Sequence, residues 1–154
     1  MSRDKTKSAA VIDHVRELLA QGRPQDALKF IDHLGRKDRE MENARGVCLM
    51  RLGKAEEAVS VLRDVAFGGN VCMPADTPAV YRLNFATAML LVNLKGAAMP
   101  ILSSLGDRDC PEAAKVKDAI RRWFRSLNFF QRCCCRIGFY PRNAVNIDFP
   151  PGEV

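Results

Sequence analysis

The sequence predicts an all-α fold in which pairs of antiparallel helices stack one on another. Three observations predict it. One spacing of small and apolar residues occurs three times, a glycine or an asparagine stands at the same point of each copy, and a further amphipathic helix follows the third copy. Apolar residues make up 47% of the 154 residues, which is enough for one domain with a buried core.

The three copies share six positions and begin 31 and 40 residues apart. Self-similarity at a period of about 20–50 residues is typical of helical-repeat proteins. A loop over 67–76, rich in glycine and proline, explains the longer second interval. The shared positions are Val15, Leu18, Gly22, Ala27, Ile31 and Leu34; Gly46, Leu49, Gly53, Ala58, Leu62 and Val65; and Ala86, Met89, Asn93, Ala98, Leu102 and Leu105.

The second copy illustrates the physical meaning of this spacing. A first helix is expected over 41–52 and a second over 55–66, with Gly53 between them. Glycine readily adopts the left-handed conformation that ends many helices. Gly46 and Ala58 are the small residues at which the two helices are expected to cross, because a small side chain lets two helix axes approach closely. Each pair leaves an apolar face open, so neighbouring pairs must stack to bury it.

The C-terminal region is predicted to hold two capping helices and a tail. A helix over 111–127 carries an apolar face, a capping box at 128–131 starts a short last helix, and Gly138 ends that helix. Four prolines and glycines after Tyr140 predict an extended tail. The predicted organisation is a flexible N-terminus over 1–7, a single domain over 8–138 and an extended tail over 139–154.

The repeated spacing resembles the tetratricopeptide repeat, which is about 34 residues long. The resemblance covers residues 8–105 in about three repeats, with Ala86 and Asn93 where the family favours glycine, and aliphatic residues at its aromatic positions. It implies a right-handed superhelix whose concave face, lined by the first helix of each pair, binds a protein or peptide. Carried across by position, the partner-binding residues would be Arg16, Leu19, Asn43, Val47, Met50, Arg51, Asn84, Thr87 and Leu91.

The resemblance also defines what is not expected. Some family members hold the C-terminal carboxylate of chaperones with a clamp of lysine, asparagine and arginine, and the matching positions here are Ile12, Arg16, Ala44, Val80 and Asn84. Chaperone-tail binding is therefore not expected. For the chain's own tail three arrangements stay open: along its own domain, in the groove of a neighbour, or bound by a partner.

Charge and cysteine content bear on partner and compartment. The net charge is +6, and residues 110–154 carry +4 of it; such a balance would favour an acidic partner, although a solvated basic face is the simpler explanation of the charge. Three of the six cysteines are adjacent, at 133–135, which does not resemble a secreted disulfide framework. Together with the polar residues 1–7 and the lack of a long apolar run, this favours a cytoplasmic protein with free thiols.

Residues 121–142 interleave arginines with aromatic residues, and three functions are compatible with this pattern. The aromatic side chains could close the end of the helical stack while the arginines stay in water. The segment could instead lie on a membrane surface or bind an acidic ligand, which is the alternative function. Contact with nucleic acid is not expected, because no recognition motif accompanies the charge.

No cofactor, metal or catalytic activity is predicted. Adjacent cysteines on a helix point about 100° apart, so Cys133–Cys135 cannot face one ion, and Cys134 is expected to pack inward with Phe130 and Ile137. The two histidines, His14 and His33, lie far from Cys133–Cys135 in the chain. The sequence therefore predicts a non-enzymatic interaction module or adaptor of undefined oligomeric state.

Overall fold

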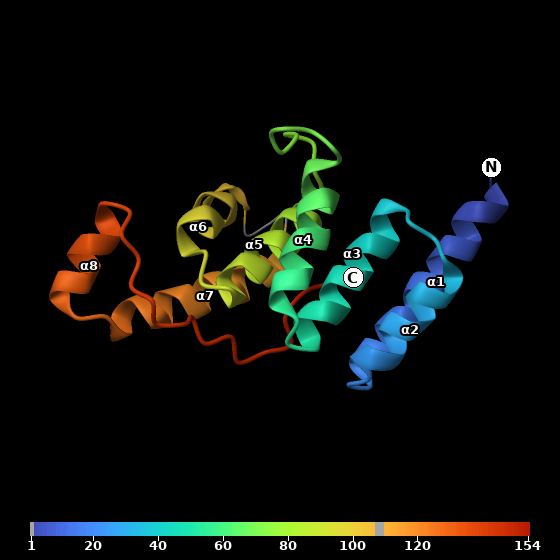
Figure 1. Ribbon diagram of the computed structural model, residues 1–154, viewed down its shortest axis with the longest axis horizontal. Coiled ribbons are helices and arrows are strands. Elements are labelled where there is room, and N and C mark those ends of the chain that lie inside the picture. Colours follow the sequence, from blue (N-terminus) through green and yellow to red (C-terminus); the bar gives the residue numbers. More distant parts are fainter. Residues whose placement is uncertain (1, 107–109) are drawn as a thin grey trace.

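The computed structural model describes residues 2–106 and 110–154, with side chains from Ala9 onward. The described residues form helices and no strands, which confirms the all-α class (Figure 1). The helices are α1 (Ser2–Ala20), α2 (Pro24–Leu34), α3 (Arg39–Arg51), α4 (Ala55–Phe67), α5 (Ala79–Leu91), α6 (Lys95–Ser104), α7 (Pro111–Ser126) and α8 (Phe129–Arg136).

The first six helices pack in chain order, each against the next. α3 also contacts both α1 and α5, so these three helices lie along one side of the stack. The positions shared by the three sequence copies form its interior: of their apolar members, every one except Leu34 is buried. The repeated spacing is thus a packing pattern, because each copy supplies the same buried positions to its helices.

The position shared by Gly22, Gly53 and Asn93 has the same backbone conformation in each copy. Their φ angles are 71°, 75° and 64°, all in the left-handed region. Asparagine is among the few non-glycine residues that adopt this region with little strain. The third copy therefore keeps the turn between its helices without the glycine.

Gly46 lies where α3 crosses α4, as the spacing predicts. A Cβ atom at this position would lie 2.4 Å from Cγ of Leu62. The matching residue of the third copy is Ala86, which is fully buried and tolerates its methyl group. At this position α3 and α4 therefore pack more tightly than α5 and α6.

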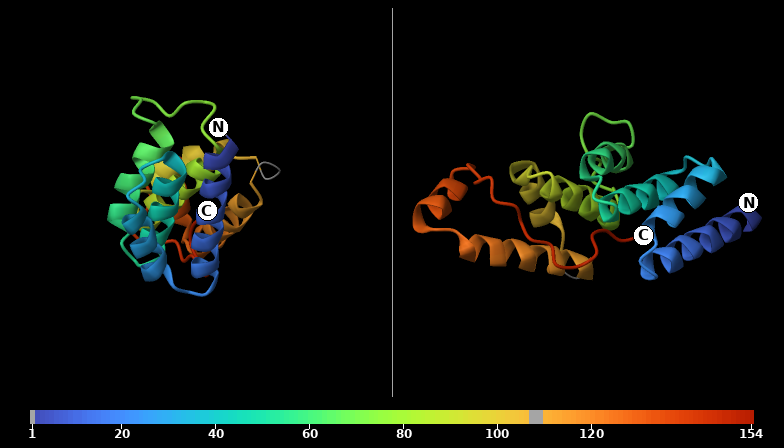
Figure 2. Two further views of the ribbon diagram at one scale, coloured as in Figure 1. Left: turned by 90° about the vertical axis from the view of Figure 1, so that its right-hand side faces the viewer. Right: turned by 60° about the horizontal axis from the view of Figure 1, so that its bottom comes forward.

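The tail returns along the helices instead of leaving the molecule. Residues 139–154 contain no helix or strand and run back from α8, beside α7, to the first helices (Figure 2). The C-terminal end of the chain lies next to α3 (Figure 1). Of the three arrangements that the sequence left open, the structure has the tail on its own domain.

Two local predictions differ from the structure. α1 begins at Ser2, six residues before the predicted start of the domain at residue 8; residues 2–7 include no glycine or proline to stop the helix. In α8 the inward cysteine is Cys135, not Cys134, and Phe130 and Ile137 point to solvent. The predicted capping box, formed by Asn128 and Gln131, sets the start of α8, but only packing sets which of its faces points inward.

Candidate functional site

The start of the tail is held by two helix side chains that donate hydrogen bonds to its carbonyl groups. Lys95 Nζ donates to the Pro141 carbonyl at 3.2 Å and to Oδ1 of Asn93 at 2.9 Å. The indole Nε1 of Trp123 donates to the Asn143 carbonyl at 3.1 Å. These two bonds direct the chain away from α8 and along α7.

Lys95 is an unusual anchor, because its side chain is only 2% exposed. Its ammonium lies 5.3 Å from the centre of the Trp123 ring, a cation–π distance. Burial lowers the pKa of Lys95, since removal from water disfavours the charged form. The lysine therefore holds the start of the tail at some electrostatic cost.

The middle of the tail is held by side chains. Val145 is buried in the core, and the carboxylate of Asp148 pairs with Arg122 of α7 at 2.8 Å. Phe149 is half-buried and packs against the core cluster. Side-chain packing thus brings the following residues to the face formed by α1, α3 and α5.

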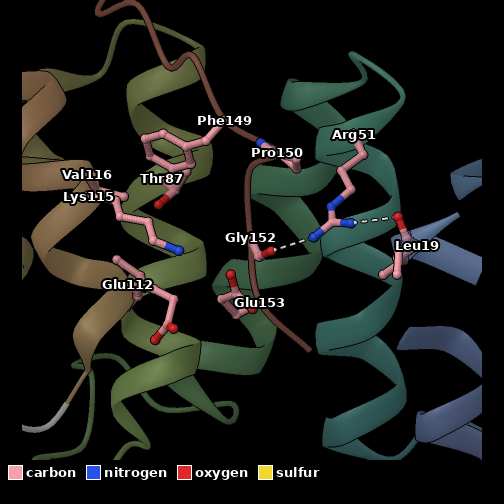
Figure 3. A pocket seen from close by; sticks show the side chains of 12 residues that line it. Leu19, Arg51, Thr87, Glu112, Lys115, Val116, Phe149, Pro150, Gly152 and Glu153 are labelled. Carbon is pink, nitrogen blue, oxygen red and sulfur yellow. Dashed lines mark hydrogen bonds between the residues drawn. The ribbon is translucent and has the colours of Figure 1, made fainter. Parts of the chain in front are cut away.

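The end of the tail is held through its main chain. Arg51 donates from Nε to the Pro151 carbonyl at 3.2 Å. It also donates from Nη2 to the Gly152 carbonyl at 3.0 Å (Figure 3). Its remaining nitrogen, Nη1, donates to the Leu19 carbonyl at 3.2 Å, which ties the guanidinium to α1. One arginine of α3 therefore binds two consecutive peptide carbonyls of the tail in a fixed orientation.

Two asparagines bind the next residue. Asn84 Nδ2 donates to the Glu153 carbonyl at 2.6 Å, and Asn84 Oδ1 accepts from the Glu153 amide at 2.9 Å. Asn43 Nδ2 donates to the same carbonyl at 3.3 Å, and Asn43 Oδ1 accepts from Asn84 at 2.8 Å. Nε of Arg16 donates to the Val154 carbonyl at 2.7 Å. The carbonyls of four consecutive residues, 151–154, are thus all bound by side chains of α1, α3 and α5.

Gly152 passes closest to the helices. A Cβ atom there would lie 2.6 Å from Cε of Met50 and 2.9 Å from Cγ2 of Val47. Its φ angle is 82°, in the left-handed region that side-chain-bearing residues rarely adopt. Both the space and the backbone conformation therefore require glycine at this point.

A cavity of about 220 Å³ remains beside the tail (Figure 3). The tail forms part of its wall, and α7 closes the side opposite α3 and α5. We call the surface that holds residues 149–154 the groove. The cavity is lined by Leu19, Ala20, Arg51, Leu83, Thr87, Glu112, Lys115, Val116, Phe149, Pro150, Gly152 and Glu153.

Most residues predicted to bind a partner lie in this groove. Arg16, Asn43, Arg51 and Asn84 bond to the tail, Val47 and Met50 face Gly152, and Leu19 and Thr87 line the cavity. Leu91 does not join them and lines a separate depression with residues 53–57. The contribution of α7 through Glu112, Lys115 and Val116 was missed, because no repeat spacing links α7 to the other helices.

A second surface lies at α8 and the loop that follows it. Phe129, Phe130, Ile137 and Phe139 are between 71% and 83% exposed. Trp123 is buried, in agreement with the closing role expected for the aromatic residues, whereas the exposure of Phe129 and Phe130 contradicts that role for them. α8 turns these two rings outward because its contact with the stack runs through Cys135.

The described part of the chain offers no group of three or more histidine, cysteine, aspartate or glutamate side chains that could hold a metal ion. All six cysteines are free. Burial raises the pKa of Cys48 to about 12, so this thiol stays protonated at neutral pH. No described helix is both long and apolar enough to cross a bilayer.

Comparisons with known proteins give no assignment of function, which therefore rests on the geometry described above. No protein-family model, curated protein or solved structure matches the chain.

Proposed function

We propose that this chain is a non-enzymatic protein-interaction module whose groove binds an extended segment of a partner protein. In this proposal α1–α6 are three antiparallel helix pairs in a right-handed, tetratricopeptide-like superhelix, and the groove is its concave face. The observation that carries the proposal is the binding of four consecutive carbonyls, 151–154, by Arg16, Asn43, Arg51 and Asn84.

The two asparagines are the strongest support. Asn84 is fully buried and Asn43 is 3% exposed, and a buried amide costs free energy unless it is hydrogen-bonded. An apolar pair at these positions would pack the helices without that requirement. Amides that bond to a peptide unit 69 residues further along the chain instead provide a means of holding an extended main chain.

The charge of the groove defines the partner further. Arg16 is exposed and Arg51 half-buried, and the wall opposite adds Lys115 and Glu112. The net charge of +6 favours an acidic partner in the approach to the surface. We therefore expect an extended segment with acidic residues near it, no cofactor, and a cytoplasmic setting in keeping with six free thiols.

The proposal is tested by selecting peptides from a random library against the full chain. Selected peptides should bind the double variant Arg16→Glu/Arg51→Glu at least ten times more weakly, because two donors to main-chain carbonyls are replaced by carboxylates. The matched control is Arg63→Glu on α4, whose side chain is exposed and pairs with its neighbour Asp64. Equal binding by the wild type and the double variant would remove the groove as the binding site.

A second candidate function rests on the exposed surface of α8. Residues 121–142 include six arginines and no acidic residue, and exposed Phe129, Phe130, Ile137 and Phe139 lie among them. Exposed apolar side chains surrounded by arginines suit the interface of an anionic membrane, where the rings insert and the guanidinium groups meet lipid phosphates. We propose peripheral binding to anionic membranes as the alternative function.

Vesicle co-sedimentation separates the two functions. The alternative predicts binding to phosphatidylserine-containing vesicles that weakens with salt and is lost in Phe129→Ser/Phe130→Ser. Val71→Ser is the control, because Val71 is an almost fully exposed apolar residue on the loop after α4, away from α8. Binding that is absent in the wild type, or unchanged in the double variant, would reject this candidate.

A further inference from the structure

The contacts at the end of the tail differ from those of a structural segment. Residues 151–154 are held by polar side chains that bond to their carbonyls, while the side chain of Glu153 is exposed at the cavity. These hydrogen bonds do not depend on which side chains the bound segment carries, although the half-buried Val154 also packs against the core. Any extended segment that fits the groove can make the same bonds, so the tail and a partner segment would compete for them.

The groove nevertheless makes one demand on sequence. At the position of Gly152 the main chain passes within contact of Met50 and Val47, and its φ angle is 82°. Val47 branches at Cβ, so its side chain cannot turn away from the bound chain, although the end of the Met50 side chain can bend. A segment with a side chain at this position must therefore lift off the helices and lose the bonds to its neighbours.

The residues before the glycine favour binding in a second way. Pro150 and Pro151 restrict the backbone to extended conformations before it reaches the groove, which lowers the entropy lost on binding. Phe149 then provides an apolar contact at the edge of the cavity. The segment 149–154 thus combines an apolar anchor, a stiff link and a glycine that fits the narrowest point.

We infer that residues 149–154 are a built-in competitor for the groove, and that the partner segment which displaces them is an extended, proline-containing segment with glycine at the position of Gly152. This inference rests on the proposed function and deepens it, because it states the class of ligand and how its binding is regulated. The covalent link keeps the competing segment at a high effective concentration, so a partner meets a largely occupied groove.

The experiment compares the full-length wild type with the full-length variant Gly152→Val. Hydrogen exchange monitored by NMR reports the amide at position 153, which donates to Asn84 in the bound tail. We expect this amide to be protected in the wild type and unprotected in the variant, with the α-helical circular dichroism unchanged. The matched control is Glu153→Ala, which removes an exposed side chain and should leave the amide protected.

The ligand class is tested with two synthetic peptides. One has the sequence of residues 148–154, and the other replaces its glycine by valine. The first should bind Gly152→Val at least ten times more tightly than it binds the wild type, since the variant's groove is free. The second should bind neither protein measurably.

Two results would overturn the inference. One is an amide at position 153 that stays protected in Gly152→Val, and the other is equal binding of the two peptides. Failure of the proposed function is a separate outcome. The inference alone would be overturned if library peptides without glycine bound through Arg16 and Arg51 while the amide at position 153 stayed protected in Gly152→Val. The proposed function would then still stand. A library that yields no groove-dependent peptide would instead reject the proposed function.

Discussion

The helical stack and the tail are held by different forces, although both depend on a glycine in close contact. In the stack Gly46 contacts Leu62 inside a continuous apolar core. In the tail Gly152 contacts Val47 and Met50, but the segment around it is held by hydrogen bonds from polar side chains. Apolar burial is the main source of folding free energy, whereas a hydrogen bond exchanged with water contributes only about 1 kcal/mol.

This difference predicts two levels of stability in one chain. The stack should unfold as a cooperative unit, because its helices share one core, which also takes in Val145 from the middle of the tail. The tail end can detach without opening that core, since water can replace the partners of its carbonyls. Segments of low local stability are those that take part in binding and regulation.

The largest effect is expected at the crossing of α3 and α4. Gly46→Ala should lower the free energy of unfolding by about 2–3 kcal/mol, because the added methyl group overlaps Leu62. Gly96→Ala on α6 is the matched control: its Cβ would meet the Tyr140 ring at 3.6 Å, an ordinary contact distance, and alanine favours a helix by about 1 kcal/mol over glycine. Urea unfolding of both variants measures the contrast, and equal midpoints would contradict the assigned crossing.

Alkaline pH should weaken the stack next. The folded protein retains the proton of Cys48 up to a pKa of about 12, while a thiol in the unfolded chain loses it near 9.0. Between these values the folded state binds more protons, so the free energy of unfolding falls as pH rises, by about 2 kcal/mol from pH 9 to 10.5.

The variant Cys48→Ala isolates this effect. Its stability should decline less over the same pH range, as measured by urea unfolding at each pH. Groups such as Lys95, whose pKa burial lowers, act in the opposite direction and are present in both proteins, so they cancel in the difference. Parallel pH profiles for the two proteins would show that Cys48 is exposed to solvent.

A smaller effect on stability, but a clear local one, is expected for the tail. Arg51→Ala removes the bonds to the carbonyls of Pro151 and Gly152 and should lower the free energy of unfolding by about 1 kcal/mol. Deuterium uptake of the peptide covering 140–154 should rise markedly, while uptake in α3 and α4 stays the same. Arg63→Ala is the control and should change neither quantity. If Arg51→Ala lost protection throughout the stack, the stack and the tail would not be separate levels of stability.

The smallest effect is expected at the outer face of α8. Phe130→Ser should change the free energy of unfolding by less than about 0.5 kcal/mol, because the ring is 75% exposed. Phe124→Ser, at a half-buried aromatic position of α7, should be more costly. Thermal unfolding compares the two, and a large loss in Phe130→Ser would mean that this ring is packed inward.

Local interactions account for what the sequence determined by itself. The order of the first six helices and the turns within each pair follow from the repeated spacing, because burial recurs at the same offsets and the left-handed position between paired helices requires glycine or asparagine. Eight of the nine residues predicted for the partner-binding face lie in the groove, since residues at equivalent offsets on α1, α3 and α5 point to one side. Their role in binding a partner stays a prediction.

Only the tertiary structure decided what occupies that groove. The residues that meet there are up to 138 positions apart, and no local spacing relates Arg16 to the end of the tail. The face of α8 was equally undetermined, because this amphipathic helix turns Phe129 and Phe130 to solvent and its contact through Cys135 depends on how α7 and the tail are placed. Helix formation is controlled by neighbouring residues, whereas the position of an extended segment depends on distant donors, such as Asn43 and Asn84, that only the complete fold brings together.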